Sequence, residues 1–388
     1  MMLTGKAMVW TDKNELKLTE LPIPEVKKDS LLIKNEVAGV CGTDGHLIQE
    51  KPPYPAILCH EIVGRVFQMG SEVHNSINVF GGPLKIGDRI TIYPWITCGK
   101  CRGCLTYRPG TCTTCDNSFV YGIPYPKLGL SGKETLSSNV NEFPYFKGGF
   151  AEYTYIFPNT YVWRVPDDMP NDVAALLDPL AVAVRSIELA QTCPGMLEEA
   201  FSTTSTVVVV GSGPVGVLTC LLARIMGVEK IILIGSRQKR LDIAKKIAHV
   251  DFTFDYHELQ NFEVIETVKE LTHGGADVIF QCANHPEAFI DALEMVRRLG
   301  SVIEVGNMVN IGTKIPIDIA RLICSKHARI IGMSANHPGS YNKAFHLLMR
   351  YKDIPFSEIF THRSNIEGVF ELLKKMHDED YMKGIMVL

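Results

Sequence analysis

The stretch that most constrains the fold is a run of valines that leads directly into a cluster of glycines. Residues 206–210 read Thr-Val-Val-Val-Val, and Gly211, Gly213 and Gly216 follow in the spacing G-x-G-x-x-G. A continuous apolar run of this length is typical of a buried parallel strand. Glycines between such a strand and an apolar-faced helix permit a tight turn where the helix N-terminus can hold a phosphate. An ordinary strand-to-helix turn is the alternative, and the flanking strand and helix favour the phosphate-binding turn.

The two halves of the chain differ in their hydrophobic period. Later apolar runs alternate with helical patterns: residues 231–234, 276–280, 301–305 and 330–332. This alternation predicts a doubly wound parallel sheet, the Rossmann architecture. Ahead of it the chain carries short alternating runs such as residues 31–37, which predict an irregular β-rich domain. We therefore expect an α/β protein with one β-rich domain and one doubly wound domain.

Composition excludes several classes of function. The chain has 388 residues, a net charge of −4 and 21% charged residues, so no basic excess points to nucleic acid. Residues 1–16 lack the apolar core of a signal peptide, and the run at 215–226 is broken by Arg224 and too short to span a bilayer. The 11 cysteines then suggest metal ligands and buried thiols rather than disulfides. We expect a cytoplasmic protein with no nucleic-acid or membrane partner.

Four cysteines form the most specific motif. Cys98, Cys101 and Cys104 are separated by two residues each, and Cys112 follows after seven more. Such spacing lets the backbone bring four sulfurs around one tetrahedral ion and leaves no position open, which is typical of a structural zinc. Unpaired buried thiols or an iron–sulfur cluster are the alternatives. Cys115 falls outside this spacing, and we expect it to be a bystander.

A second group of ligand types lies earlier in the chain. Cys41, His60 and Glu61 offer a thiolate, an imidazole and a carboxylate, the groups that hold a catalytic zinc with one open position. Thr43 adds a hydroxyl, and His46 adds a base that titrates near neutral pH. Isolated cysteines and histidines are also common in protein cores, and His46 could be a plain surface histidine.

One further acidic residue has two readings. Asp178 stands in Leu177-Asp178-Pro179 at the start of a helical pattern. It could cap that helix, whose first turn carries the proline. It could also be a metal ligand supplied from the junction between the domains. The sequence leaves both possibilities open.

The end of the second strand of the doubly wound half indicates the nucleotide. An acidic residue there would bind the ribose 2′-hydroxyl and repel a 2′-phosphate. This chain carries Gly235, Ser236 and Arg237 instead, with Arg240 close behind. Gly235 leaves room, Ser236 can donate a hydrogen bond and Arg237 can pair with a phosphate dianion. Basic residues at the start of a helix are often simply solvated, but the pattern favours NADP over NAD.

Taken in order, these motifs resemble those of the zinc-containing medium-chain dehydrogenase/reductases, over nearly the whole chain. The resemblance rests on residues 41–46, His60-Glu61, the four-cysteine lobe at 98–112, residues 148–153 and the glycine-rich turn at 211–216. It implies a GroES-like catalytic domain over residues 1–178 and 331–388. It also implies a Rossmann dinucleotide-binding domain over residues 179–330 and a catalytic zinc between the two.

The resemblance also assigns roles to individual residues. It makes Cys41 and His60 zinc ligands and places Asp178 at the third-ligand position, where the family carries Cys or Glu. Glu61 lies close behind the metal or alternates as a ligand, so direct binding by Asp178 or Glu61 stays open. Lys383 falls where a C-terminal basic residue of the family reaches the cofactor phosphates. The remaining candidate cofactor residues are Pro214, Val215, Cys282, Val305 and Gly306.

The chemistry follows from these residues. A zinc ion with an open position makes an alcohol hydroxyl acidic, and Thr43 can pass its proton through the nicotinamide ribose to His46. The nicotinamide must carry the hydride because Zn²⁺ has no redox chemistry. We expect an oxidoreductase acting on CH–OH donors, on a secondary, aromatic or aliphatic alcohol or its carbonyl, using NADP(H). Two zinc ions per subunit and a homodimer or homotetramer are expected.

Two alternatives remain open. One is an NAD-linked polyol or sugar-alcohol dehydrogenase, because related polyol enzymes carry a carboxylate at the third-ligand position. The other is a nucleotide-binding interaction protein without catalytic activity. The presence of Cys41, Thr43, His46 and His60 argues against the second alternative, since a binding protein has no use for a proton relay.

Overall fold

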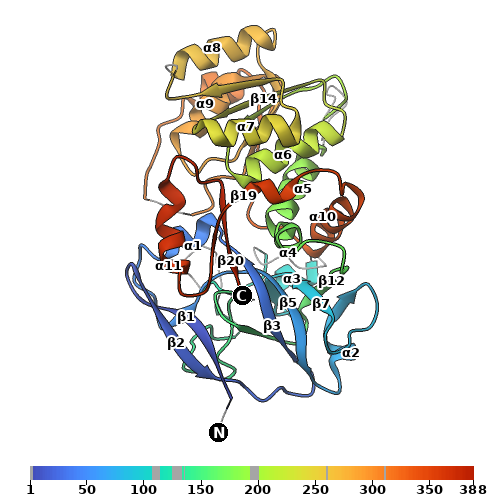
Figure 1. Cartoon of the computed structure of the whole chain (residues 1–388). Helices are drawn as coiled ribbons and strands as arrows, with labels where there is room; N and C mark the ends of the chain where they lie inside the picture. The colour runs from blue at the N-terminus through green and yellow to red at the C-terminus, as the bar shows by residue number, and fades with distance from the viewer. Residues whose placement is uncertain are drawn as a thin grey trace. The chain divides into compact units, whose positions relative to one another are not determined.

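A computed structural model describes residues 3–106, 114–124, 133–134, 136–192, 201–258, 261–309 and 312–388 (Figure 1). The chain forms two compact units. The first comprises Met1–Asp178, His337–Asp353 and Phe360–Leu388. The second comprises Pro179–Asn336 and the short segment Ile354–Ile359. The C-terminal part of the chain therefore contributes to both units.

The second unit is built on one six-stranded parallel sheet. Its strand order is β15-β14-β13-β16-β17-β18, and every neighbouring pair in it is parallel. The strands are β13 (Thr206–Val210), β14 (Lys230–Gly235), β15 (Phe252–Asp255), β16 (Ala276–Gln281), β17 (Val296–Glu304) and β18 (Arg329–Gly332). Because the order reverses beside β13, the carboxyl end of β13 is the switch point where such sheets bind nucleotides. The doubly wound sheet expected from the sequence is confirmed.

Helices cover this sheet because its strands are apolar on both faces. Val208, Ile232 and Ile279 form a buried cluster with residues of α8 and α9, while α6 and α7 pack against each other (Figure 1). Alternate side chains along a strand point to opposite faces, so the valine run supplies core to both layers. The helices of this unit, apart from α5, are α6 (Pro214–Ile225), α7 (Gln238–Ala248), α8 (Asn261–Leu271), α9 (Glu287–Met295) and the short η1 (Ala320–Cys324) and η2 (Phe356–Ile359).

The first unit is β-rich, and its largest sheet has eight strands. The order is β19-β20-β3-β5-β7-β12-β6, with β11 also paired to β3. The strands are β3 (Leu31–Gly39), β5 (Glu61–Met69), β6 (Asn78–Phe80), β7 (Arg89–Ile92), β11 (Tyr153–Ile156), β12 (Tyr161–Arg164), β19 (Phe360–Ser364) and β20 (Lys383–Val387). Strands from the two ends of the chain thus lie next to each other, which brings residue 383 close to residues 39–41.

Two three-stranded sheets complete the first unit. They follow the orders β2-β1-β4 and β10-β9-β8. Their strands are β1 (Thr4–Asp12), β2 (Glu15–Pro22), β4 (Ala56–Ile57), β8 (Trp95–Thr97), β9 (Asn117–Val120) and β10 (Lys133–Glu134). The helices are α1 (Gly42–Leu47), α2 (Val73–Ser76), α3 (Arg102–Thr106), α4 (Asn171–Ala175), α10 (Pro338–Arg350), α11 (Val369–Lys374) and η3 (Lys375–His377), and α5 (Leu177–Ala190) begins at the boundary between the units. The expectation of an irregular β-rich domain is confirmed.

Within the described residues, the helices are all too short or too polar to cross a lipid bilayer.

Candidate functional site

Strand pairing in the first unit brings distant ligand-type residues together. Strand β3 ends at Gly39, which is paired with Glu61 at the start of β5 and with Ile385 in β20. Cys41 follows β3 and precedes α1, while His60 immediately precedes β5. Three strand ends therefore meet at one place, and Cys41, His60, Glu61 and Lys383 lie around it.

The geometry of this cluster fits a metal ion. The ligand atoms of Cys41, His60 and Glu61 all lie within 4.8 Å of one another. A tetrahedral zinc with bonds of about 2.0–2.3 Å needs ligand atoms roughly 3.5 Å apart, so only small shifts separate this arrangement from a zinc site. In addition, the buried Nδ1 of His60 has no hydrogen-bond partner among the described residues. The donor set is therefore suited to a cation such as Zn²⁺.

The electrostatics of the cluster lead to the same conclusion. Burial by itself lowers the pKa of His60, but the neighbouring Cys41 sulfur and the carboxylates of Asp178 and Asp44 raise it to about 10. A pKa raised this far shows that negative groups surround the imidazole. A divalent cation would neutralise these groups more completely than one proton does.

Asp178 joins the cluster from the start of α5. Its Oδ2 lies 3.9 Å from His60 Nε2, and its Oδ1 accepts a hydrogen bond from the Tyr341 hydroxyl. The carboxylate thus makes side-chain contacts at the candidate metal centre. Burial raises the pKa of Tyr341 well above its ordinary value, so this phenol stays protonated and can donate.

Glu61 is held by a buried ion pair. The Lys383 ammonium lies 2.8 Å from Oε1 and 2.6 Å from Oε2 of Glu61, and it donates a 2.9 Å hydrogen bond to the Val40 carbonyl. Each of the two charged side chains is 3% exposed. Burial lowers the pKa of Lys383, but the Glu61 carboxylate outweighs it and raises that pKa overall. Glu61 therefore has a balancing positive charge next to it within the cluster.

This arrangement gives Lys383 partners that the sequence analysis did not foresee, and its expected contact with the cofactor phosphates stays a prediction. The resemblance made it a contact for the cofactor phosphates, whereas the structure directs its ammonium to Glu61 and Val40. The ammonium donates one hydrogen bond to Glu61 Oε1 and one to the Val40 carbonyl. The pairing across β20 and β3 is long-range, so no local pattern in the sequence pointed to it.

Asp44 is a site residue to which the sequence analysis gave no role. It is fully buried, and its carboxylate accepts hydrogen bonds of 2.9 Å from the Cys41 N–H and 3.1 Å from the Cys59 N–H. One side chain therefore ties the segment that carries Cys41 to the segment that carries His60. The available signal was an acidic residue three positions after Cys41, where a short helix begins.

Thr43 and His46 lie on the same short helix. Both are half-buried in α1, and their spacing of three residues places them on one face of it. Burial lowers the pKa of His46, and the nearby His377 lowers it further. The structure thus gives His46 a partly buried setting rather than that of a plain surface histidine, and a neutral imidazole that can accept a proton. Its place in a proton relay stays a prediction.

The lowered pKa of His46 predicts a particular pH dependence. The predicted role of His46 requires a neutral imidazole, so its lowered pKa should let the predicted dehydrogenase reaction persist at pH values below the ordinary pKa of histidine. His377→Asn should raise the pKa of His46 and move the acidic limb of the kcat profile to higher pH. The matched control is His74→Asn at an exposed histidine of α2. The role of His46 would be contradicted if wild type, His377→Asn and His74→Asn had the same acidic limb in their kcat profiles. It would also be contradicted if this limb persisted in His46→Gln.

Within the described part of the chain, the second metal-ligand cluster contains four sulfurs, three of which the spacing predicted. Those of Cys98, Cys101, Cys104 and Cys115 lie within 4.8 Å of one another. Cys112 lies outside the described residues, so its role stays a prediction. Cys115 is nevertheless not the bystander that the spacing suggested, because its Sγ accepts N–H hydrogen bonds of 3.2 Å from Cys98 and 3.4 Å from Asn117. The sequence analysis missed this residue because it counted only the seven-residue gap.

Backbone amides also support a thiolate at this cluster. The N–H groups of Cys104 and Asp116 donate to Cys101 Sγ at 3.5 and 3.4 Å and lower the pKa of Cys101 to about 7. Burial raises the pKa of Cys115. A buried sulfur among three others becomes a stable thiolate when a cation balances its charge, which is the setting of a structural zinc.

We predict that Cys115 binds the structural ion. Cys115→Ser should reduce the zinc content by one ion per chain and lower the Tm, because a structural site contributes folding free energy. Zinc content by mass spectrometry and thermal unfolding give the readouts. Cys324→Ser, at an exposed free cysteine, is the matched control. A full zinc content in Cys115→Ser, together with loss of one ion in Cys112→Ser, would restore the assignment made from the spacing.

The glycine-rich turn has the geometry that phosphate binding requires. Gly211 ends β13 with a φ of +107°, which favours glycine, and a Cβ at Gly216 would lie 1.9 Å from the Gly211 carbonyl oxygen. Gly213 precedes α6, and a Cβ on it would meet no atom within 4 Å. Pro214 and Val215 form the first turn of that helix. A phosphate at the N-terminus of α6, a helix of 12 residues, would therefore meet backbone N–H groups and no side chain at Gly213.

The residues expected to select the nucleotide also meet at this turn. A Cβ at Gly235 would lie 2.4 Å from Ser212 Oγ, so the turn itself requires a glycine at the end of β14. Ser212 Oγ donates to the Ser236 carbonyl at 2.8 Å and accepts from the Ser236 N–H at 3.3 Å. Arg237 then precedes α7, and Arg240 lies in its first turn. No carboxylate side chain occupies residues 235–240.

The other predicted cofactor residues lie at the same edge of the sheet. The Cys282 N–H donates to the Val210 carbonyl at 2.7 Å, and the N–H groups of Val305 and Gly306 donate to the Gln281 carbonyl at 2.9 and 2.8 Å. Segments that follow β13, β16 and β17 are thereby held together. A Cβ at Gly306 would lie 2.2 Å from the Ala283 carbonyl oxygen, so this position also needs a glycine.

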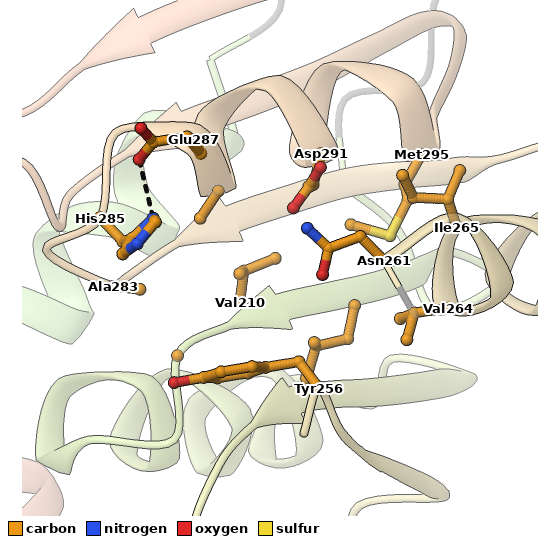
Figure 2. A pocket seen from close by; sticks show the side chains of 13 residues that line it. Val210, Tyr256, Asn261, Val264, Ile265, Ala283, His285, Glu287, Asp291 and Met295 are labelled. Carbon is orange, nitrogen blue, oxygen red and sulfur yellow. Dashed lines mark ion pairs between the residues drawn. The ribbon is translucent and has the colours of Figure 1, made fainter. Parts of the chain in front are cut away.

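A cavity of about 160 Å³ opens beside these residues (Figure 2). Val210, Ile234 and the Tyr256 ring form apolar walls, and the side chains of Asn261 and Asp291 point into it. The sequence analysis missed these residues, although Tyr256 directly follows β15 and is thus at the carboxyl edge of the sheet. The remaining lining residues are Gly211, Val264, Ile265, Ala283, His285, Glu287, Ala288 and Met295.

Comparisons with known proteins agree with this fold. Two family models match: the alcohol dehydrogenase GroES-like domain over residues 27–167 and the zinc-binding dehydrogenase over residues 214–350. A sorbitol dehydrogenase from Bacillus subtilis is 29% identical over 311 residues, covering 78% of this chain and 74% of the relative. An L-threonine 3-dehydrogenase from Bacillus licheniformis is 28% identical over 368 residues, covering 92% and 91%.

A solved structure extends the comparison to the whole chain. An alcohol dehydrogenase from Thermotoga maritima matches with a TM-score of 0.84 at 28% identity over 99% of each chain. The fold and the two family models define a GroES-like and Rossmann zinc dehydrogenase. The chain belongs to the zinc-containing medium-chain dehydrogenase/reductase family, which confirms the resemblance seen in its sequence. Its class is that of zinc-dependent dehydrogenases acting on CH–OH groups.

Proposed function

We propose that the protein is an NADP-preferring, zinc-dependent dehydrogenase that interconverts a secondary, aromatic or aliphatic alcohol and its carbonyl. The observation that carries the proposal is the cluster of Cys41, His60 and Glu61, which offers a thiolate, an imidazole and a carboxylate within 4.8 Å of one another. Asp178 adds a second carboxylate, 3.9 Å from His60 Nε2, and we assign the third ligand position to it. Three protein ligands of these types leave one position of a zinc ion for substrate. When bound there, zinc supplies Lewis-acid activation of the substrate oxygen.

The chain's own residues perform the remaining steps. Cys41, His60 and Asp178 hold the ion, while Glu61 stays behind them with its charge balanced by Lys383. Thr43 would accept the substrate hydroxyl proton, and His46, on the same face of α1, would take up that proton and release it to solvent. The lowered pKa of His46 suits it to accept that proton near neutral pH. The nucleotide carries the hydride.

Residues 235–237 of the second unit favour NADP over NAD, and two further features of this unit fit a dinucleotide of either kind. Gly235 stands where an acidic residue would repel a 2′-phosphate, and Ser236 and Arg237 offer hydrogen bonds and positive charge beside it. The α6 N-terminus provides the pyrophosphate site. We assign the cavity lined by Val210, Ile234 and Tyr256 to the adenine ring, because these walls are apolar or aromatic and the cavity is adjacent to the turn.

An NAD-linked polyol dehydrogenase is the second candidate. The sorbitol dehydrogenase among the relatives and the carboxylate of Asp178 favour it. We further propose two zinc ions per subunit, the second on Cys98, Cys101, Cys104 and Cys115, and a homodimer or homotetramer in the cytoplasm.

The proposal is tested with the purified, zinc-loaded protein. A panel of secondary, aromatic and aliphatic alcohols, polyols and L-threonine is followed at the nicotinamide absorbance with NADP and with NAD. The expected result is turnover that is faster with NADP and is lost when a chelator removes the exchangeable zinc. Faster turnover of polyols with NAD would favour the second candidate. Absence of turnover with every substrate would favour an interaction protein.

A further inference from the structure

The two oxygens of the Asp178 carboxylate have different surroundings. Oδ2 lies on the side of His60, 3.9 Å from its Nε2. Oδ1 accepts a hydrogen bond from the hydroxyl of Tyr341, a residue of α10 that is 163 positions further along the chain. Only one oxygen of this carboxylate is therefore directed to the ligand cluster.

Tyr341 is itself rigidly held. It is fully buried, and its ring meets Tyr93 edge-on at 5.0 Å and Trp163 at 5.3 Å. Trp163 stacks on Phe80 with an interplanar angle of 3°, and its Nε1 donates a 3.3 Å hydrogen bond to Asn342. The hydroxyl of a tyrosine packed in this way has little freedom to turn away from Asp178.

We propose that Tyr341 is the positioning residue of the third zinc ligand: it engages Oδ1 of Asp178 so that Oδ2 alone binds the ion. This inference rests on the proposed zinc site. A carboxylate that bound through both oxygens would occupy a further position on the metal, which substrate needs. An aspartate is one methylene shorter than the glutamate of relatives, so its approach depends more strongly on the group behind it. Partners of ligating carboxylates commonly contribute 10- to 100-fold to metal affinity.

The test is Tyr341→Phe, which keeps the ring and removes the hydroxyl. Transfer of zinc to a chelating dye should show release from the Cys41 site about 10–100-fold faster than in wild type, with release from the cysteine cluster unchanged. After exchange of the Cys41-site zinc for Co²⁺, the visible spectrum should change as well, because it reports ligand geometry. If Tyr341 contributed only to packing, its substitution would not accelerate the release of one zinc ion while leaving the release of the other unchanged.

The matched control is Tyr121→Phe. Tyr121 is a fully buried tyrosine of the same unit, and its hydroxyl contacts Thr160 Oγ1 at 3.0 Å and the Phe157 N–H at 2.9 Å. Its loss should leave both zinc release rates at the wild-type level. A double-mutant cycle with Asp178→Ala then locates the effect, since Tyr341→Phe should cause no further acceleration once the carboxylate is gone.

The outcomes separate this inference from the proposed function. Zinc release and a Co²⁺ spectrum like those of wild type in Tyr341→Phe, or additive effects in the cycle, overturn the role of Tyr341 and leave the zinc enzyme intact. A wild-type protein that binds no zinc at Cys41 and His60 overturns the proposed function itself. If Tyr341→Phe fails to fold, a zinc-loaded crystal structure of the wild type decides. One Asp178 oxygen at about 2.0–2.2 Å from the ion supports the inference, and two such oxygens contradict it.

Discussion

Replacing Cys41 by alanine should lower kcat/KM for alcohol oxidation by about 10³-fold or more. The thiolate is one of three proposed protein ligands, and without it the site no longer retains zinc. Lewis-acid activation contributes several kcal/mol to the transition state, and each ~1.4 kcal/mol is a factor of ten in rate. Steady-state kinetics together with the zinc content of the same preparation measure the effect. The variant should retain one zinc per chain, held by the cysteine cluster.

Cys59 provides the matched control for this experiment. It lies one residue before His60, is fully buried, and its Sγ donates to the Gly39 carbonyl at 3.3 Å. Burial raises its pKa well above the ordinary value, so it is a neutral thiol and a poor ligand. Cys59→Ala should keep the zinc and most of the activity. Equal losses of activity in the two variants would show that the segment needs its packing, not a thiolate at residue 41.

Replacing Arg237 by alanine should reduce the preference for NADP. The guanidinium is proposed to pair with the 2′-phosphate, and hydrogen bonds to charged groups contribute about 1.5–3 kcal/mol. The expected loss in kcat/KM for NADP is therefore about 10–100-fold, whereas NAD, which lacks this phosphate, should be affected little. Parallel kinetics with both nucleotides at a fixed alcohol concentration give the ratio.

Lys239 is the control for a general effect of charge. It is an exposed cation in the first turn of α7, two residues from Arg237. Lys239→Ala removes one positive charge near the turn without removing the proposed partner of the phosphate. Similar losses of kcat/KM for NADP in Arg237→Ala and Lys239→Ala would show that the general positive charge of this region causes the preference for NADP. An unchanged preference in Arg237→Ala would remove the basis for choosing NADP and favour the NAD-linked alternative.

The structure explains why an acidic residue is absent at the end of β14. A side chain at Gly235 would run into Ser212, which is already bonded to both backbone groups of Ser236. A Gly235→Asp exchange alone would therefore disturb the glycine-rich turn as well as the charge. Ser212→Gly would have to accompany it in any attempt to redesign the cofactor preference.

Local sequence patterns predicted much of the fold. The valine run ahead of Gly211 is a strand because it is apolar on both faces, and the glycines mark a turn where no Cβ fits. Both features depend on residues that are neighbours in the chain. The sequence also showed that Cys41 and His60 are potential metal ligands, since the donor atom that a side chain offers is fixed by its residue type. Family membership followed from the order of these motifs.

The partners of these residues could not be read from the sequence. Tyr341 lies 163 positions from Asp178, and Lys383 lies 322 positions from Glu61. Cys115 lies in the sulfur cluster although the spacing of the motif had left it out, because backbone folding decides which sulfurs come together.

The sequence by itself thus determined which chemical groups this protein has, and where strands and turns occur. Tertiary structure alone decided which of those groups meet, which charges are balanced and which oxygen of Asp178 is hydrogen-bonded to Tyr341. The reason is physical: side-chain chemistry and backbone period are local properties, whereas burial and pairing depend on strands such as β3, β5 and β20 coming together from distant parts of the chain.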